Sequence, residues 1–342
     1  MTKIWMRTSS SKKWYKGGAV VANTTVVEAT NNNELKKQSI INMIRSLLPI
    51  IGLVAVFIVF NVLTKGNMWT SRKLILNQVY VVLISAVGVF FIMSMGGLDF
   101  SQGSIMGIAS IVVCKLSGVN MILAVICGIL AGAAIGAFNA YFYVNRKIKS
   151  FIVTICTMFL FRGFIKYMAS NSPVAASMKV YDYDTTAVKL GITIAVLAVS
   201  FVVFRFTKFG IHLKAIGAGE KATKFAGVRT DRMKFFIYVL AGAITGLAAF
   251  VNIVKNGSAT ANVGNQLETQ ILIALVLGGM PISGGAKVRF ENIIVGSLLY
   301  IVLNNGLIMM GLTTQAMQLV QGVVFLIFVA IFADRQSLSV IK

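Results

Sequence analysis

The sequence has few charged residues and very few acidic ones. Only 12% of its 342 residues are charged and only 10 are Asp or Glu, whereas 57% are hydrophobic. So little polar surface cannot cover a soluble globule of this size. The composition therefore predicts an integral membrane protein and excludes an ordinary soluble enzyme.

Residues that commonly carry catalysis are also scarce. His212 is the only histidine, and the cysteines, Cys114, Cys127 and Cys156, all lie in apolar stretches, which indicates no disulfide framework. No Gly-Lys dipeptide occurs, so a phosphate-binding loop of the Walker type is absent. We therefore expect no catalytic residue, no metal site and no cofactor in this chain. Energy for any transport must come from another chain or from an ion gradient.

Long apolar stretches recur from residue 47 to residue 333. A hydrocarbon core about 30 Å thick needs about 20 apolar residues per helix, and lipid offers the backbone no hydrogen-bond partner. The pattern predicts an all-α membrane fold of about ten transmembrane helices, of which the third and eighth are short and are candidates for broken or re-entrant segments. The helices are expected at about 47–64, 74–95, 103–117, 119–142, 151–170, 188–206, 235–254, 268–280, 292–310 and 315–333.

Basic residues gather between the apolar stretches. Of the 32 Lys and Arg, 8 precede Ser46, 3 lie in 145–150 and 8 lie from Arg205 to Lys234. This placement is typical of cytoplasmic loops under the positive-inside rule rather than of a nucleic-acid surface. With both termini in the cytoplasm, 23 of the 32 fall inside, 6 outside and 3 within helices.

The same pattern divides the chain into three parts. Residues 1–45 are expected to be a disordered basic cytoplasmic tail, 46–334 a transmembrane domain with a cytoplasmic loop at 207–234, and 335–342 a second cytoplasmic tail. Residues 1–33 contain no apolar core of a cleavable signal peptide, so the first helix is expected to remain as an anchor.

Two glycine-rich runs interrupt the apolar stretches, GGLDFSQGS at 96–104 and GGMPISGG at 278–285. Transporters are often built from repeats whose discontinuous helices form the substrate path. The two runs are therefore either corresponding points of an internal duplication or a chance match of short motifs.

Asp99 and Arg162 are the charged residues expected deep among the spans. An ionisable side chain there is costly unless paired, capped or hydrated. Asp99 could cap the helix that begins near Ser101, or line a substrate path, or do both. Arg162 could bind a polar solute or pair with Asp99, and the alternative is a structural ion pair or a snorkelling side chain. Further hydrogen-bonding side chains within apolar helices are Asn77, Thr154, Thr157, Asn304 and Asn305, each of which could equally join helices.

The loop at 207–234 contains a predicted short helix. Glycines at 217 and 219 can break the chain, and residues 220–226 can form a helix with Glu220 in its first turn, where the helix dipole favours an anion. Such a helix could dock into a groove of a cytoplasmic partner. The alternative is a merely solvated basic loop.

Several motifs occur in an order that resembles a known family. They are GGLDFSQGS at 96–104, FIVT at 151–154 followed by FRG at 161–163, the segment 209–228, GGMPISGG at 278–285 and LNNGL at 303–307. The sequence resembles the ribose and galactoside permeases of bacterial ABC importers, which are related to branched-chain amino-acid permeases. The resemblance covers nearly everything from about Leu47 to Asp334.

The resemblance implies the membrane-spanning subunit of an ATP-driven sugar importer in a bacterial cytoplasmic membrane. Its partners would be a second permease copy, identical or not, two ATP-binding cassette domains that hold ATP and Mg²⁺, and an external sugar-binding protein. It also implies that the short cytoplasmic helix couples to the ATPase through Gly217, Gly219, Glu220, Lys221, Ala222, Phe225, Ala226, Gly227 and Val228. The expected substrate path is lined by Asn77, Asp99, Ser101, Gln102, Ser104, Phe151, Thr154, Thr157, Arg162, Ser283, Asn304 and Asn305.

Some positions depart from the family pattern. Ser150 replaces the usual proline, Gln102 replaces a small apolar residue, and Lys221 and Thr223 alter the coupling segment. These departures bear on which solute is carried. Alternative solutes are autoinducer-2, a nucleoside or a branched-chain amino acid, and an alternative class is a gradient-driven carrier.

Overall fold

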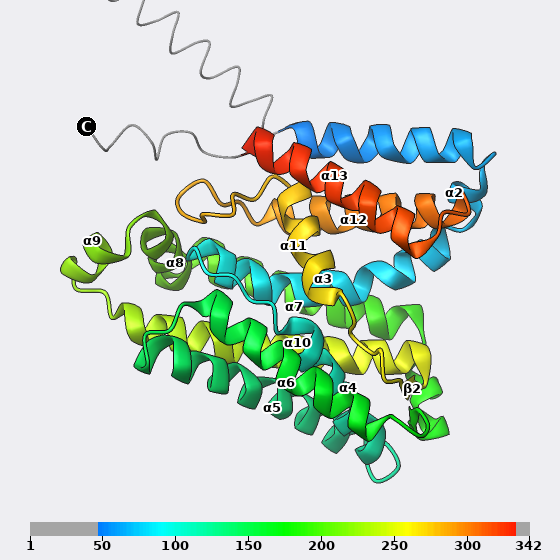
Figure 1. The fold of residues 1–342 in the computed structure, drawn as a ribbon, viewed down its shortest axis with the longest axis horizontal. Coiled ribbons are helices and arrows are strands. Elements are labelled where there is room, and N and C mark those ends of the chain that lie inside the picture. The colour runs from blue at the N-terminus through cyan, green and yellow to red at the C-terminus, as the bar shows by residue number, and fades with distance from the viewer. Residues whose placement is uncertain (1–46, 333–342) are drawn as a thin grey trace, which may run out of the picture. The chain divides into compact units, whose positions relative to one another are not determined.

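The computed structural model describes residues 47–332, so the expected tails at 1–45 and 335–342 lie outside the described residues. The described chain is almost wholly helical (Figure 1). After the apolar helix Leu47–Leu63, its elements are α2 (Asn67–Thr70), α3 (Arg72–Ser94), α4 (Gln102–Leu116), α5 (Met121–Ala140) with a π-helical turn (Tyr141–Asn145), α6 (Ser150–Met168), β1 (Val174–Ala175), a 3₁₀ helix (Met178–Tyr183), α7 (Thr186–Phe206), α8 (Lys208–Ala218), α9 (Glu220–Phe225), α10 (Thr230–Asn256), β2 (Ser258–Ala259), α11 (Leu267–Leu277), α12 (Glu291–Met309) and α13 (Thr314–Phe332).

Seven of the described helices are long and apolar enough to cross a membrane. They correspond to α3, α5 with its π-helical turn, α6, α7, α10, α12 and α13. The other three expected spans are shorter apolar helices: Leu47–Leu63, α4 and α11. At 1.5 Å per residue, α4 and α11 reach only about 23 and 17 Å, too short for a core about 30 Å thick. The structure therefore supports a multi-pass helical membrane protein, but ten full crossings are not confirmed.

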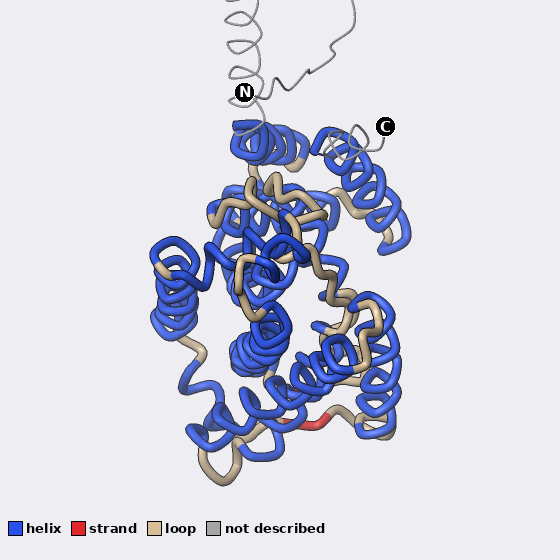
Figure 2. Tube along the Cα trace, turned by 90° about the vertical axis from the view of Figure 1, so that its left-hand side faces the viewer, coloured by secondary structure: helices blue, strands red, loops and turns tan. Residues whose placement is uncertain are grey.

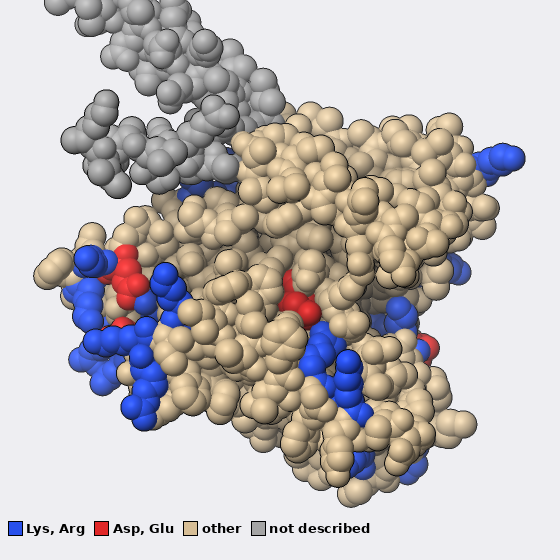
Figure 3. All heavy atoms as spheres, viewed as in Figure 1, with Lys and Arg blue, Asp and Glu red and all other residues tan. Residues whose placement is uncertain are grey.

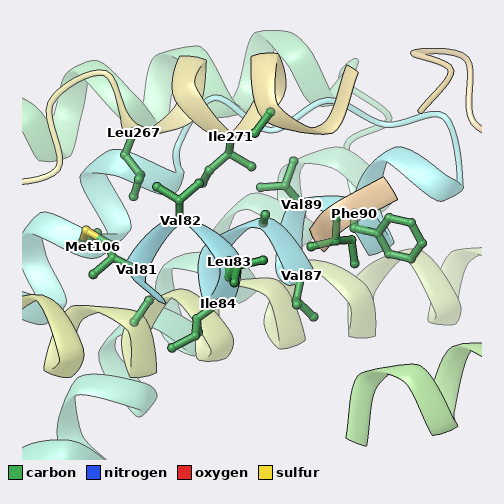
Figure 4. Packing of buried hydrophobic residues seen from close by; sticks show 14 of the residues in the cluster. Val81, Val82, Leu83, Ile84, Val87, Val89, Phe90, Met106, Leu267 and Ile271 are labelled. Atoms are coloured by element: carbon green, nitrogen blue, oxygen red, sulfur yellow. The ribbon is translucent and has the colours of Figure 1, made fainter. Parts of the chain in front are cut away.

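Helix α3 forms the centre of the bundle. It is apolar on every side, and all its residues from Val79 to Ser94 are buried, as expected for a helix surrounded by others. Figure 4 shows its Val82 directed toward Leu267 and Ile271 of α11, and its Val81 near Met106 of α4. The glycine break at 96–97 thus follows directly from the most buried helix.

Helices α5 and α10 pack backbone against backbone. A Cβ added to Gly132 on α5 would lie 2.1 Å from the carbonyl oxygen of Gly242 on α10, and one added to Gly246 would lie 2.4 Å from the carbonyl oxygen of Gly128. Small residues spaced by four positions allow such close approach, which supplies packing energy that the hydrophobic effect cannot supply in lipid. This contact holds α10 beside the break.

The long helices run side by side, with the short elements at their two ends. In Figure 1, α8 and α9 lie at one end of the bundle and α2 and β2 at the other, and Figure 2 shows many helices nearly end-on. At the second end β1 and β2 pair antiparallel, with Val174 opposite Ala259. The segment expected to be the main cytoplasmic loop is thus at one end of the bundle only.

Candidate functional site

The break between α3 and α4 is built around Asp99. This side chain is buried, and its carboxylate accepts hydrogen bonds from the backbone N–H of Ser101 at 2.7 Å, from the Ser101 hydroxyl at 2.6 Å and from the Gln102 side-chain amide at 2.7 Å. An Asp that accepts from the amide two residues later forms a turn that starts a helix. Helix α4 begins at Gln102 with Ser101 as its N-cap and without a side-chain cap hydrogen bond, so Asp99 shapes the turn before the helix instead of serving as its N-cap.

Three neighbouring helices hydrogen-bond to this break. Asn139 of α5 donates to the Ser101 hydroxyl at 2.8 Å, and Thr245 of α10 donates to the side-chain carbonyl of Gln102. Thr154 of α6 accepts from a backbone N–H of the break at 3.2 Å. All of these side chains are buried, and Asn139 Oδ1 has no hydrogen-bond partner within the described chain. The break is a buried polar centre with one unused acceptor.

Arg162 of α6 lies in a second polar centre. Its guanidinium donates to the carbonyl oxygen of Gly264 at 2.7 Å and to that of Val263 at 3.4 Å, and it is 3.3 Å from the Glu268 carboxylate. The two side chains are 13% and 8% exposed, so solvent screens the ion pair only weakly. Arg162 therefore joins α6 to the loop before α11 and to the first turn of α11.

This pairing corrects two expectations. Arg162 does not pair with Asp99, because the carboxylate of Asp99 is occupied by Ser101 and Gln102. Asp99 is also not the only acidic side chain deep among the helices, because Glu268 is buried as well. Glu268 was missed because it lies at the edge of an expected span, where an acidic residue needs no partner.

Several predicted path residues do lie next to the break. The Ser104 hydroxyl donates to the carbonyl oxygen of Ser101 at 2.7 Å, and the ring of Phe151 meets that of Phe100 edge-on with centroids 5.6 Å apart. Thr157, one turn along α6 from Thr154, is 2% exposed. The structure thus gathers residues from 100 to 104 and from the first half of α6 around one point.

Other predicted path residues lie elsewhere. Asn305 on α12 donates to the side-chain carbonyl of Gln78 on α3 at 2.9 Å, and Gln321 on α13 donates to Asn304 at 2.9 Å. Asn77 is half-buried on α3. The contacts of Asn304 and Asn305 join helices, which is the second of the two interpretations open from sequence.

The two glycine-rich runs meet each other. A Cβ added to Gly284, whose φ is +68°, would lie 2.4 Å from the carbonyl oxygen of Met93 and 2.7 Å from the backbone nitrogen of Gly96. A Cβ added to Gly96 would lie 3.0 Å from the carbonyl oxygen of Ser283, whose side chain is exposed. Backbones this close leave no room for side chains between them.

The end of α8 joins the same contact. The N–H of Gly285 donates to the carbonyl oxygen of Ser94 at 3.1 Å, and a Cβ added to Gly217 would lie 2.3 Å from that oxygen and 2.5 Å from the Gly285 nitrogen. We call this meeting of residues 93–97, 217 and 283–285 the glycine junction. It connects the segment α8–α9 directly with the chain that leads into the break at Asp99.

Helix α9 follows the junction and is exposed. The chain turns at Gly219. Helix α9 then runs from Glu220 to Phe225, as the sequence predicted. Glu220 forms an ion pair with Lys234 of α10, and the ring of Phe225 is 92% exposed. Within α9 only Thr223 is buried, and its hydroxyl donates to the carbonyl oxygen of Gly219 at 2.9 Å. The Phe225 ring is therefore available for contact at the end of a short helix that Glu220 anchors to α10.

Positive charge gathers around α8 and α9. Figure 3 shows Lys and Arg clustered at this end of the described chain. Lys214 of α8 is one of them; partial burial and the nearby Arg205 lower its pKa. A cluster of this kind at one end of a helix bundle is typical of loops outside the hydrocarbon core.

Comparison with known proteins shows which family this architecture belongs to. Residues 72–329 match the family described as "Branched-chain amino acid transport system / permease component". The chain belongs to this permease family. A permease component acts within a larger transport system, in agreement with the exposed helix α9. No solved structure matches the chain.

Individual permeases of known name are also similar to this one. It is 31% identical to the ribose import permease protein of Bacillus subtilis, over 89% of this chain and 97% of the relative. It is 28% identical to the ribose import permease protein of Escherichia coli, over 85% of this chain and 94% of the relative. It is 29% identical to the fructose import permease protein of Rhizobium meliloti, over 86% of this chain and 87% of the relative.

Proposed function

We propose that this permease is the membrane-spanning subunit of an ATP-driven importer that carries a neutral sugar. The observation that carries the proposal is the exposed helix α9 with Phe225 at its tip, joined through the glycine junction to a buried polar break. The relatives named for ribose and fructose import support the choice of a sugar. The sequence itself contains no nucleotide-binding loop, so ATP and Mg²⁺ would be held by a partner.

The proposed assembly contains two permease copies, two ATP-binding domains below and a sugar-binding protein outside. In this arrangement residues 46–334 form the transmembrane domain with about ten helices, including the shorter α4 and α11. Residues 1–45 and 335–342 are cytoplasmic tails, and the membrane is the bacterial cytoplasmic membrane. The basic residues around α8 and α9 support this orientation.

Coupling would act through the glycine junction. When the ATP-binding domains close, they move α9 through Phe225 and its neighbours Glu220, Lys221 and Ala222. Gly217 transmits the movement to Ser94 because no side chain separates the two backbones. A close-packed contact between backbones has few alternative arrangements, so it transfers a displacement rather than absorbing it.

The buried break would open toward the substrate path in response. Its groups are hydroxyls, amides and one carboxylate, which can each exchange hydrogen bonds with sugar hydroxyls. Asn139 Oδ1, unused within the described chain, is an acceptor available to a passing hydroxyl or to water. The predicted path residue that hydrogen-bonds with Asn139 is Ser101.

Uptake measurements test the proposal. Cells without a ribose permease would express this chain with ATP-binding and sugar-binding subunits of a sugar importer, and uptake of labelled ribose, allose and fructose would be compared. We expect uptake of at least one sugar, abolished by ATP depletion while the proton gradient is maintained. Uptake that survives ATP depletion, or that needs no ATP-binding subunit, would contradict the proposal.

A further inference from the structure

The loop between β2 and α11 runs back from one end of the bundle toward its middle. In Figure 1 it leaves β2 at the end opposite α8 and α9 and reaches the start of α11 beside α3. Residues 261–266 of this loop form consecutive turns, with no helix or strand until Leu267. We call residues 260–266 the return loop.

The contact with Arg162 sets the depth of the return loop. Arg162 lies 12 residues after the first and 6 before the last residue of α6, a candidate membrane span from Ser150 to Met168. At 1.5 Å per residue it is about 18 Å from one end and about 9 Å from the other, which is inside the hydrocarbon core. Its bond to the carbonyl oxygen of Gly264 therefore holds non-helical backbone at membrane depth.

One side of the return loop is fixed against the bundle. Val263 and Leu267 are buried, and a Cβ added to Gly264 would lie 2.2 Å from the carbonyl oxygen of Gly103 in the first turn of α4. Gln266 adopts a left-handed backbone with φ +62°, which is uncommon for a residue other than glycine. This conformation directs the chain into α11 and fixes which residues face outward.

The other side of the return loop is polar and exposed. Asn262, Asn265 and Gln266 are exposed, and so are Thr260 before them and Thr269 after them. Most exposed residues of neighbouring α6 are instead large and apolar, such as Phe159 and Phe164, although Lys166 near its end is exposed as well. Lipid offers amide side chains no hydrogen bond, and irregular backbone at membrane depth occurs only where it is buried in protein or lines a water-filled cavity.

We infer that the return loop lines a water-filled cavity of the transport path and that Asn262, Asn265 and Gln266 bind the sugar there. Each amide both donates and accepts, which matches a neutral solute with many hydroxyls. The charges beside the loop, Arg162 and Glu268, are paired with each other and so do not favour an ionic solute. The water-filled lining stands on the structure alone, whereas the sugar contact rests on the proposed function.

Cysteine accessibility tests the lining. In a chain whose cysteines at 114, 127 and 156 are replaced, Asn265→Cys and Asn262→Cys would be treated with a charged, membrane-impermeant methanethiosulfonate reagent in right-side-out and inside-out vesicles. We expect both to react from at least one side, while the control Leu160→Cys, on the exposed apolar face of α6, does not. If neither asparagine position reacts from either side, the loop is covered by lipid or by the second permease copy and the inference is overturned.

Protection by the sugar tests the contact. In vesicles that contain the complete transporter, saturating ribose should slow labelling of Asn265→Cys several-fold, and Asn265→Ala should raise the ribose concentration for half-maximal uptake about two- to tenfold, the range for one hydrogen bond. The control Asn256→Ala, an exposed asparagine at the end of α10, should leave uptake unchanged. If ribose does not slow the labelling of Asn265→Cys, and Asn265→Ala has the same ribose concentration for half-maximal uptake as the unmodified chain, the proposed sugar contact is overturned. Absence of any ATP-dependent uptake by the unmodified chain would instead count against the proposed function.

Discussion

A Cβ added to Gly217 would lie 2.3 Å from the carbonyl oxygen of Ser94, so the end of α8 and the end of the central helix α3 touch without an intervening side chain. Gly217 lies three residues before the exposed helix α9, and Ser94 lies five residues before Asp99. The proposed coupling segment and the polar break are therefore in mechanical contact through this pair.

Substitution of Gly217 by Ala should impair coupling. The added methyl group must displace backbone, which in a well-packed contact costs about 1–3 kcal/mol. We expect ATP hydrolysis by the assembled transporter to continue while sugar uptake per ATP falls. The matched control is Gly191→Ala on α7, since nothing lies within 4 Å of its added Cβ. Equal uptake per ATP in the two variants would exclude the junction as the route of coupling.

Removal of the Phe225 ring should weaken binding of the ATP-binding subunit. The ring is 92% exposed at the tip of α9, so Phe225→Ala leaves no cavity in the permease itself. Apolar rings that become buried at an interface commonly contribute 2 kcal/mol or more, which corresponds to about 30-fold in affinity. Co-purification and an affinity titration measure the loss.

The control for Phe225 is Phe159→Ala, which removes an exposed ring from the candidate span α6. That variant should bind the ATP-binding subunit normally. Normal binding by Phe225→Ala would show that α9 does not dock through this ring.

The ion pair between Arg162 and Glu268 should reveal itself in a double-mutant cycle. Replacing Arg162 by Met leaves a buried carboxylate without its cation, and replacing Glu268 by Leu leaves the guanidinium without its anion; breaking a buried pair this way costs about 3–5 kcal/mol. The double variant removes both charges and should recover much of the loss. Thermal unfolding of the purified permease in detergent measures the stability of the two single variants and the double variant. Strictly additive losses of stability would argue against an ion pair between Arg162 and Glu268.

Substitutions of Asp99 can separate its role in the turn before α4 from a role in the substrate path. Asn keeps an acceptor oxygen for the backbone N–H of Ser101, whereas Ala removes that hydrogen bond, which costs about 1 kcal/mol. We therefore expect Asp99→Asn to retain thermal stability and membrane abundance and Asp99→Ala to lose stability. If Asp99 also lines the path, uptake falls in both variants. Normal uptake by a stable Asp99→Asn protein would show that Asp99 acts only in the turn before α4 and not in the substrate path.

The lowered pKa of Lys214 predicts that the stability of the folded protein depends on pH. Burial and Arg205 lower the pKa of Lys214 in the folded protein, so between that lowered pKa and the ordinary value of about 10.4 the unfolded chain binds more protons. The free energy of unfolding should therefore rise as pH increases through this window. Lys214→Met should flatten the rise when unfolding temperatures are compared across alkaline pH. An identical pH dependence in both proteins would refute the lowered pKa.

Much of this protein was already determined by its sequence. Apolar stretches of lipid scale can form little but buried or lipid-facing helices, so the approximate positions of the apolar helices followed from local composition, whereas those of α2 and α8 did not. The hydrogen bond from the Ser101 amide to Asp99 and the turn at Gly219 followed for the same reason, because both depend on residues within a few positions. The basic residues from Arg205 to Lys234 indicated which segment lies outside the membrane.

The tertiary structure decided what depends on residues distant in sequence. Arg162 pairs with Glu268, 106 positions away, because the return loop brings the start of α11 to α6, and no periodicity encodes that loop. Gly217 touches Ser94 for a related reason: glycines permit close approach, but they do not specify which backbone approaches. The sequence by itself determined where the apolar helices form, because this depends on the transfer free energy of each segment into lipid. Only the packing of the helices determined which residues meet, such as Arg162 with Glu268, because these contacts form between helices that can each fold independently.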